Sequence, residues 1–198
     1  MNSDTHLALC DIQMFAHIPN FIYLAPFTKS EYKNMLKFAT TQKNHPVGIR
    51  VPAEFSEIDT CDNTDYTIYN KNKIVLNGNT VAIFAIGKMM DMALDIAKKV
   101  KQEKNLDITV INPLFLTGLD ETLLNDLKKN HKLVITLEDG ELMGGYGQNI
   151  SSFYGTSDIL VKNFGISKKF HTDFTSEDLL KENGMSVENI SNIIENML

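Results

Sequence analysis

The feature that most constrains this chain is the alternation of short apolar runs with helical periodicities through its last two thirds. The run 132–137 is nearly all apolar, which is typical of a strand buried on both faces. Strands that alternate with helices form a mostly parallel sheet, and right-handed crossovers place the helices on both faces. The sequence therefore predicts an α/β domain over residues 72–198. The expected strands are 73–76, 80–86, 107–111, 132–137 and 159–164, and the expected helices are 89–103, 120–130, 145–153, 176–183 and 186–198.

The first two of these strands flank a short polar turn. Asn77, Gly78 and Asn79 separate the segments 73–76 and 80–86. Turns of this composition connect the strands of β-hairpins. We therefore expect these two strands to pair with each other.

A smaller α/β unit is predicted at the N-terminus. An apolar strand at 21–25 is followed by Thr28 and Glu31, a capping-box pair that begins a helix, and a second strand follows at 47–51. About 50 residues rarely bury enough surface to fold alone. We therefore expect residues 1–52 to need support from another part of the protein.

An acidic stretch separates the two units. Five acidic residues and no Lys or Arg lie between Val51 and Asn70, in a chain whose net charge is −6. The stretch has no clear helical or strand period. We expect residues 53–71 to form a solvated linker.

The composition excludes several classes of protein. With 198 residues, 43% hydrophobic residues and a negative net charge, the chain is predicted to be globular and a poor ligand for nucleic acid or anionic membranes. No apolar run reaches the roughly 18 residues of a membrane helix, and no signal peptide is recognisable. Two cysteines without metal or redox spacing suit a reducing compartment, so we expect a cytoplasmic location.

Three groups of residues are candidates for chemistry. Gly144-Gly145-Tyr146-Gly147 precedes a predicted helix and is compatible with phosphate binding, although a glycine-permitted tight turn is favoured. Glu138, Asp139 and Glu141 are compatible with a hard cation, but a solvated loop explains them equally well, and we predict no metal site. His6 with Asp11 is the best candidate for a catalytic or substrate-binding pair, against the alternative of a surface histidine near a terminus.

A motif spread over the N-terminal unit carries a family resemblance. Thr5-His6, Asp11-Ile12, Ile18-Pro19-Asn20 and Ala25-Pro26 occur in an order and spacing that resemble 1-deoxy-D-xylulose-5-phosphate synthases, thiamine-diphosphate enzymes of the transketolase group. The resemblance continues through Asn112-Pro113, the segment 134–139 and the glycines at 144–147, and covers nearly the whole chain.

The resemblance implies that the chain is the C-terminal part of such an enzyme. Residues 1–52 correspond to the last part of a pyrimidine-binding domain, and residues 72–198 to a transketolase C-terminal domain. The complete enzyme would condense pyruvate with glyceraldehyde 3-phosphate for isoprenoid precursor and thiamine biosynthesis. Thiamine diphosphate and Mg²⁺ would be held by upstream diphosphate- and pyrimidine-binding domains, so the isolated chain is expected to be inactive, to bind no cofactor, and to assemble as a homodimer when complete.

The resemblance also assigns residue roles. His6 matches a histidine that lines the substrate pocket, while Asp11 and Arg50 are expected to support that pocket. The family's phosphate-binding Arg is replaced by Ala53, and its pocket Asp falls on Asn2. Because alanine has no guanidinium for a phosphate, two alternatives stay open: a non-catalytic assembly or regulatory module, and a split transketolase half with another acceptor.

Overall fold

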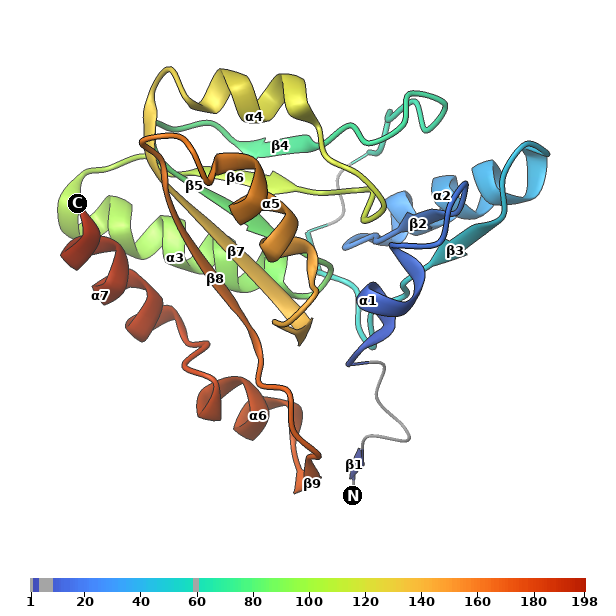
Figure 1. Cartoon of the computed structure of the whole chain (residues 1–198). Helices are drawn as coiled ribbons and strands as arrows, with labels where there is room; N and C mark the ends of the chain where they lie inside the picture. The colour runs from blue at the N-terminus through green and yellow to red at the C-terminus, as the bar shows by residue number, and fades with distance from the viewer. Residues whose placement is uncertain (1, 4–8, 59–60) are drawn as a thin grey trace.

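The computed structural model describes every residue except 1, 4–8 and 59–60. Its centre is a five-stranded sheet of order β4-β6-β5-β7-β8, in which β5, β6, β7 and β8 run parallel and β4 is antiparallel to β6 (Figure 1). The expected α/β fold with a mostly parallel sheet is confirmed. The five strands are β4 (Lys73–Leu76), β5 (Thr80–Ala85), β6 (Thr109–Asn112), β7 (His131–Glu141) and β8 (Leu160–Ile166).

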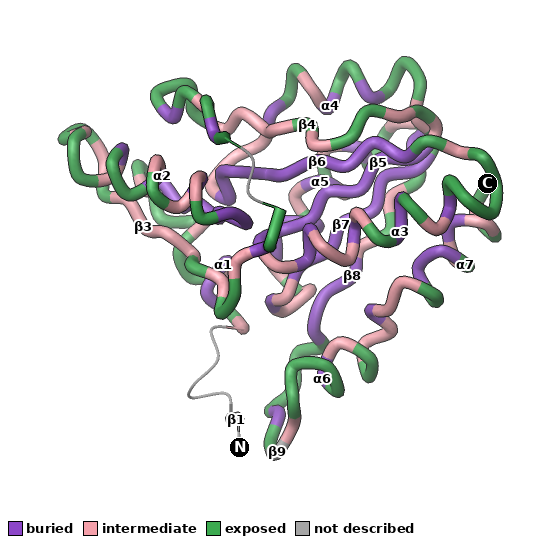
Figure 2. Tube along the Cα trace, turned by 180° about the vertical axis from the view of Figure 1, so that it is seen from behind, coloured by how far each residue is buried: buried purple, intermediate pink, exposed green. Residues whose placement is uncertain are grey.

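Helices cover both faces of this sheet, as the alternation of elements predicted. Val81 and Ile83 of β5 face α3, α6 and α7, while Ala82 and Phe84 face α4 and α5. The two resulting hydrophobic cores enclose the central strands, which are buried along most of their length (Figure 2). These helices are α3 (Met89–Lys104), α4 (Glu121–Leu127), α5 (Tyr146–Tyr154), α6 (Ser176–Glu182) and α7 (Val187–Met197).

The predicted hairpin is wrong, because β6 lies between β4 and β5. The turn does not join paired strands but docks on the start of β6, where Gly78 N–H donates to Thr109 Oγ1 at 3.1 Å and Asn79 N–H donates to the Asp107 carbonyl at 2.9 Å. β5 is buried from Val81 onward and takes parallel neighbours on both sides, whereas β4 alternates half-buried and exposed residues as an edge strand does.

The N-terminal unit contains a two-stranded parallel sheet with a helix on each face. β2 (Ile22–Leu24) pairs with β3 (Val47–Ile49), α2 (Lys29–Thr41) connects them, and α1 (Asp11–Phe15) precedes β2. The unit leans on the main domain through β2, whose Tyr23 carbonyl accepts from Leu116 N–H at 2.8 Å. The short strands β1 (Asn2–Ser3) and β9 (Thr172–Phe174) form a separate antiparallel pair.

The predicted capping box of α2 forms only in part. Thr28 Oγ1 accepts from Glu31 N–H at 3.1 Å, but the Glu31 carboxylate accepts from Phe27 N–H rather than from the cap residue. Glu31 is fully buried and also binds Asn112 of β6 and Lys73 of β4. The residue expected to cap a helix therefore also ties the N-terminal unit to the main sheet.

In its described part, 53–58 and 61–71, the acidic stretch forms neither helix nor strand. Asp62 is nevertheless buried and accepts hydrogen bonds from Asn34, Thr64 and Tyr66. The charge of the stretch predicted that all of it is solvated, but Asp62 is an exception. Its hydrogen-bond donors replace water around the buried carboxylate. The domain boundaries at 52 and 72 stay a prediction.

In the described part of the chain, no helix is long and apolar enough to cross a membrane.

Candidate functional site

Arg50, just after β3, binds side chains from α1 and from the end of β7. Its Nε donates to Oδ2 of Asp11 at 2.7 Å, and its Nη1 donates to Oδ1 of Asp139. Tyr23 Oη donates to the same Asp11 oxygen at 2.5 Å. The Arg50 and Asp11 side chains are only 12% and 7% exposed. This cluster, defined by Asp11, Tyr23, Arg50 and Asp139, is called the Arg50 cluster below.

The elements of the fold explain how these residues meet. Arg50 directly follows β3 and Tyr23 lies in β2, its parallel neighbour. Asp11 is the first residue of α1, and Asp139 lies near the end of β7. The carboxyl ends of parallel strands, where open α/β sheets bind their ligands, bring these side chains together.

Electrostatics within the Arg50 cluster favour a charged guanidinium. Burial opposes the charge, but the carboxylates of Asp139 and Asp11 outweigh it and raise the pKa of Arg50 above its usual range. Burial and the nearby Asp11 carboxylate raise the pKa of Tyr23, so its hydroxyl stays a donor. Arg50 therefore stays a fixed positive charge, and the Tyr23 hydroxyl keeps its proton.

Glu138 occupies the N-terminus of α5. Its two carboxylate oxygens accept from Tyr146 N–H at 2.9 Å and from Gly147 N–H at 3.0 Å. Burial raises the pKa of Glu138 to about 7, against the lowering effect of these backbone donors. A helix N-terminus attracts anions, and here the chain supplies its own. The glycine motif therefore does not present a free phosphate site.

Two of the glycines in this motif are required by geometry. Gly144 has a φ of +77°, a backbone angle that residues with a side chain rarely adopt. This agrees with the tight turn that the sequence favoured here. Gly147 packs against β7 and β8 so closely that a Cβ would overlap Thr136 Oγ1 and lie 2.9 Å from Asn163 Cγ. The motif thus serves the close approach of α5 to the sheet.

The acidic residues before this helix serve different partners. Glu138 binds the start of α5, while Asp139 binds Arg50. Across the described residues, no group of three or more His, Cys, Asp or Glu side chains is arranged to hold a metal ion.

The predicted site residues are brought together only in part. Asp11 and Arg50, which the resemblance names as pocket support, are in direct contact. His6 lies outside the described residues, so its position stays a prediction. Tyr23 and the pairing of Asp139 with Arg50 were missed, because nothing local in the sequence links them.

A mixed-charge cavity of about 720 Å³ is lined in part by Glu54, which follows Ala53 in the sequence. Lys29 and Lys88 line it, but so do the acidic side chains of Glu54, Glu57 and Asp91. Lys88 Nζ is already paired with Asp91 at 2.8 Å. The cavity therefore has no excess of positive charge for a phosphate.

The comparison with known proteins covers the whole chain. The model of the transketolase C-terminal domain family matches residues 70–190. The 1-deoxy-D-xylulose-5-phosphate synthase of Alkaliphilus oremlandii is 32% identical over 192 residues, which cover 96% of this chain and 30% of the relative. The same enzyme of Clostridium perfringens is 33% identical over 201 residues, covering 100% of this chain and 32% of the relative. The chain thus spans about a third of the length of these curated relatives.

Solved structures share the fold. A split gene transketolase, described as an inactive beta4 tetramer, superposes with a TM-score of 0.81 and 23% identity over 98% of this chain and 63% of that one. Transketolase from Leishmania mexicana gives a TM-score of 0.70 and 16% identity over 98% of this chain and 28% of that one. These structures show the shared fold. The family model matches more than half of the residues, and the chain therefore belongs to the transketolase C-terminal domain family.

Proposed function

We propose that this chain is the C-terminal part of a transferase like 1-deoxy-D-xylulose-5-phosphate synthase, which joins pyruvate to glyceraldehyde 3-phosphate with loss of carbon dioxide. The observation that carries the proposal is the Arg50 cluster. It anchors Asp11, and with it the segment that resembles the family's substrate-pocket loop, to the carboxyl end of β7. The similarity of nearly the whole chain to synthases from several bacteria supports the same conclusion.

The residues of this chain do not fit the cofactor of such an enzyme. The sequence contains no Gly-Asp-Gly…Asn motif for a metal-bound diphosphate. The N-terminus of α5, which could otherwise attract a diphosphate, is filled by the Glu138 carboxylate. We therefore propose that upstream domains of the complete enzyme hold thiamine diphosphate and Mg²⁺ and that the chain alone is inactive. A cytoplasmic homodimer is the assembly proposed for the complete enzyme.

The chain's own contribution is substrate binding. His6 would donate a hydrogen bond to a substrate oxygen or move a proton there, at the pocket edge. The Arg50 cluster would fix the position of Asp11, five residues after His6, because the buried charges of the cluster resist displacement of Asp11. Arg50 and Asp11 are positioning residues in this proposal.

A split transketolase half with another acceptor is the second candidate. Its support is Ala53 together with the mixed-charge cavity, where Glu54 and Glu57 accompany the two lysines. An acceptor without a phosphate would suit this cavity better than a phosphorylated one.

A chimera tests the proposal. The upstream two thirds of the Alkaliphilus oremlandii synthase, ended where the similarity begins, are fused to residues 1–198, and product is measured with pyruvate and glyceraldehyde 3-phosphate. Product formation by the chimera, but by neither part alone, is expected. A chimera that binds thiamine diphosphate and folds but forms no product would favour the non-catalytic assembly module. Turnover with unphosphorylated glyceraldehyde alone would favour the second candidate.

A further inference from the structure

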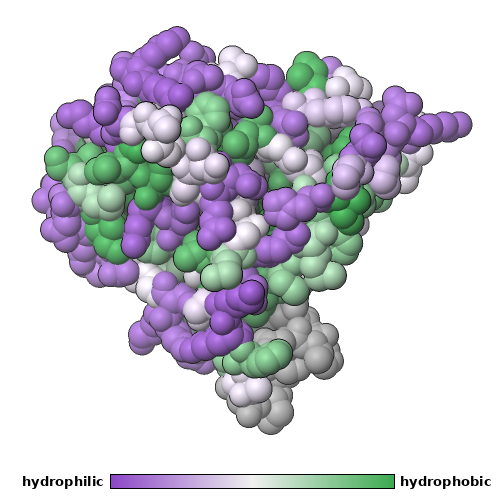
Figure 3. Space-filling view, viewed as in Figure 1, coloured by the Kyte–Doolittle hydropathy of each residue, from purple (hydrophilic) through white to green (hydrophobic). Residues whose placement is uncertain are grey.

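Two cavities adjoin where the N-terminal unit meets the main domain. The first, of about 320 Å³, lies among the α1–β2 turn, His45 and the loop after β6, and the second, of about 370 Å³, continues from there to α5. Both are lined by Ala16, His17 and Thr117. Together they are called the junction groove below. Figure 3 shows this face of the molecule, on which hydrophilic and hydrophobic side chains lie side by side between α5 and the N-terminal unit.

The junction groove has no ionic lining. Among the described residues that line it there is no Lys, Arg, Asp or Glu, although these types make up 22% of the chain. The mixed-charge cavity differs in this respect, because Lys29, Glu57 and Asp91 are among the residues around it. A charged ligand would find no opposite charge in the junction groove, and an unpaired charge is costly to bury. The lining therefore favours an uncharged ligand.

Aromatic rings surround the first cavity. The ring of Tyr69 lies 5.6 Å from that of His45, at nearly a right angle, and 6.3 Å from that of Phe115. Nδ1 of His45 lies 3.1 Å from the Asn20 carbonyl oxygen. Because a carbonyl only accepts, Nδ1 carries the proton, and Nε2 of the neutral ring is left as an acceptor. Ring surfaces with a few polar groups among them suit a planar heteroaromatic ligand.

Polar side chains of the second cavity are free to bind a ligand. The side chains of Thr117, Asn149 and Ser152 make no hydrogen bond within the described part of the chain. The Asn70 amide lies where the two cavities meet, since a Cβ at Gly118 would be only 2.4 Å from its Nδ2. These hydroxyl and amide groups can both donate to and accept from ligand hydroxyls.

The junction groove is separate from the proposed substrate pocket. Phe21 and His45 line it just before β2 and β3, so it lies at the amino ends of these strands. The Arg50 cluster lies at their carboxyl ends. Five residues of nearly extended chain lead from His45 to Arg50, a span of roughly 16 Å. A ligand in the groove would therefore leave the Arg50 cluster untouched.

We propose that the junction groove binds an uncharged heteroaromatic molecule with a hydroxylated substituent, the chemistry of a nucleoside without phosphate. The heteroaromatic ring lies among Tyr69, Phe115 and His45, and the hydroxyl groups bind the polar side chains of the second cavity. Each cavity exceeds the roughly 300 Å³ at which small-molecule pockets begin. Segments of both units line the groove, so the ligand ties them together. This site is additional to the proposed function and does not depend on it.

Adenosine is the probe for this site. The isotope-labelled 198-residue chain is titrated with adenosine, and chemical shifts are followed by NMR. A dissociation constant below about 1 mM is expected for a ligand of this size. Shifts are expected at Asn70, Thr117 and Ser152 and not at Tyr23 or Arg50. Adenosine monophosphate should bind no more tightly, because the groove supplies no cation.

Thermal stability gives a second readout. A ligand that binds only the folded chain, at about ten times its dissociation constant, should raise the melting temperature by about 4 °C. Adenosine is therefore expected to shift the melt of the wild type by this amount.

A matched pair of variants isolates the groove. Asn70 and Asn105 both have a left-handed backbone, with φ of 60° and 54°, so glycine replaces either residue without strain. Asn105 follows α3 and does not line the groove. Asn70→Gly is expected to weaken adenosine binding about 3- to 10-fold, the effect of one lost hydrogen bond, and Asn105→Gly to leave it unchanged. Melts of both free variants check that they remain folded.

Several results would overturn the inference. Absence of saturable adenosine binding would do so, as would an equal loss of affinity in the two variants. Tighter binding of the monophosphate, or shifts centred on Arg50, would contradict an uncharged site at the junction. The proposed function is tested separately by the chimera, so its failure and the failure of this site are distinguishable.

Discussion

Arg50 Nε donates to Oδ2 of Asp11 over 2.7 Å, although 39 positions separate the two residues in the chain. The same guanidinium binds Asp139, which lies a further 89 positions along the chain. One buried side chain thus holds the N-terminal segment against the end of β7. Both the position of the N-terminal segment and the proposed substrate pocket depend on these contacts of Arg50.

Replacing Arg50 by alanine should destabilise the chain markedly. The variant leaves Asp11 buried beside Asp139 without a compensating charge, and breaking such a pair costs about 3–5 kcal/mol. The free energy of unfolding in urea measures the loss. Lys101→Ala is the control, since Lys101 and Asp107 form an exposed pair that is worth at most about 1 kcal/mol. Equal effects of the two variants would contradict a structural role for the Arg50 cluster.

The close approach of α5 predicts that Gly147 tolerates no side chain. Gly147→Ala would place a methyl group against Thr136 and Asn163, and overpacking of this kind costs about 1–3 kcal/mol. At Gly155, just after the same helix, a Cβ meets carbonyl oxygens only at 3.5 Å. Gly155→Ala should therefore leave the melting temperature nearly unchanged or slightly raised. If the two variants have the same melting temperature, the packing of α5 against β7 and β8 is looser than described.

The pH dependence of stability should contain a contribution from Glu138. Burial raises its pKa from about 4.5 to about 7 in the folded chain, so the folded state binds more protons between these values. The contribution of Glu138 to the free energy of unfolding is then fully present below pH 4.5. It falls by roughly 3 kcal/mol as the pH rises through 7. Urea denaturation of the wild type and Glu138→Gln across this range measures the difference. Parallel curves for the two proteins would refute the contribution.

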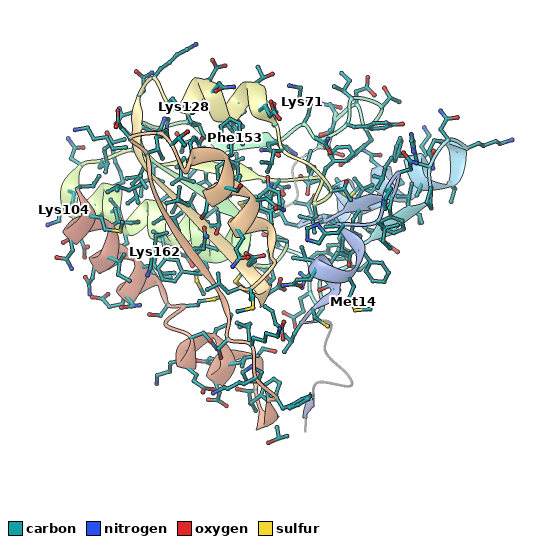
Figure 4. All side chains as sticks on the ribbon, viewed as in Figure 1. Met14, Lys71, Lys104, Lys128, Phe153 and Lys162 are labelled. Carbon is teal, nitrogen blue, oxygen red and sulfur yellow. The ribbon has the colours of Figure 1, made fainter. Side chains whose placement is uncertain are left out.

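Much of the fold follows from the sequence because burial on both faces leaves a plain signal. The apolar runs at 80–86 and 132–137 correspond to β5 and β7, and the helical period at 89–103 corresponds to α3. The hairpin failed because strand order is decided by tertiary packing rather than by a turn. α1 was missed because it has only five residues and no helical period: Met14, which Figure 4 labels, and Phe15 are both exposed.

The candidate site could be predicted only in part, because its contacts also depend on tertiary packing. Asp11 and Arg50 were named from their motifs, but no local pattern indicates that they touch. Asp139 was considered as a ligand for a cation, and its pairing with Arg50 depends on the approach of two sheets. The half-buried Lys73 likewise binds Glu31 across 42 positions, which no spacing rule anticipates.

In the proposed function, the upstream domains bind the cofactor, so the isolated chain should have no affinity for it. Calorimetric titration of the isolated chain with thiamine diphosphate and Mg²⁺ should give no binding heat, because the α5 N-terminus already holds Glu138 and the diphosphate motif is missing. The chimera should bind the cofactor. Micromolar affinity of the isolated chain would contradict this division.

The central claim is that this chain supplies the substrate-binding side of a thiamine-dependent transferase, and His6 tests it most directly. In the chimera, kcat/KM and the melting temperature are measured for the wild type and His6→Ala. The account predicts a fall in kcat/KM of about 10²–10⁴-fold with an almost unchanged melting temperature, because a histidine that binds substrate or moves a proton contributes to turnover rather than to folding. A nearly normal kcat/KM, or a loss explained entirely by a lower melting temperature, would contradict it.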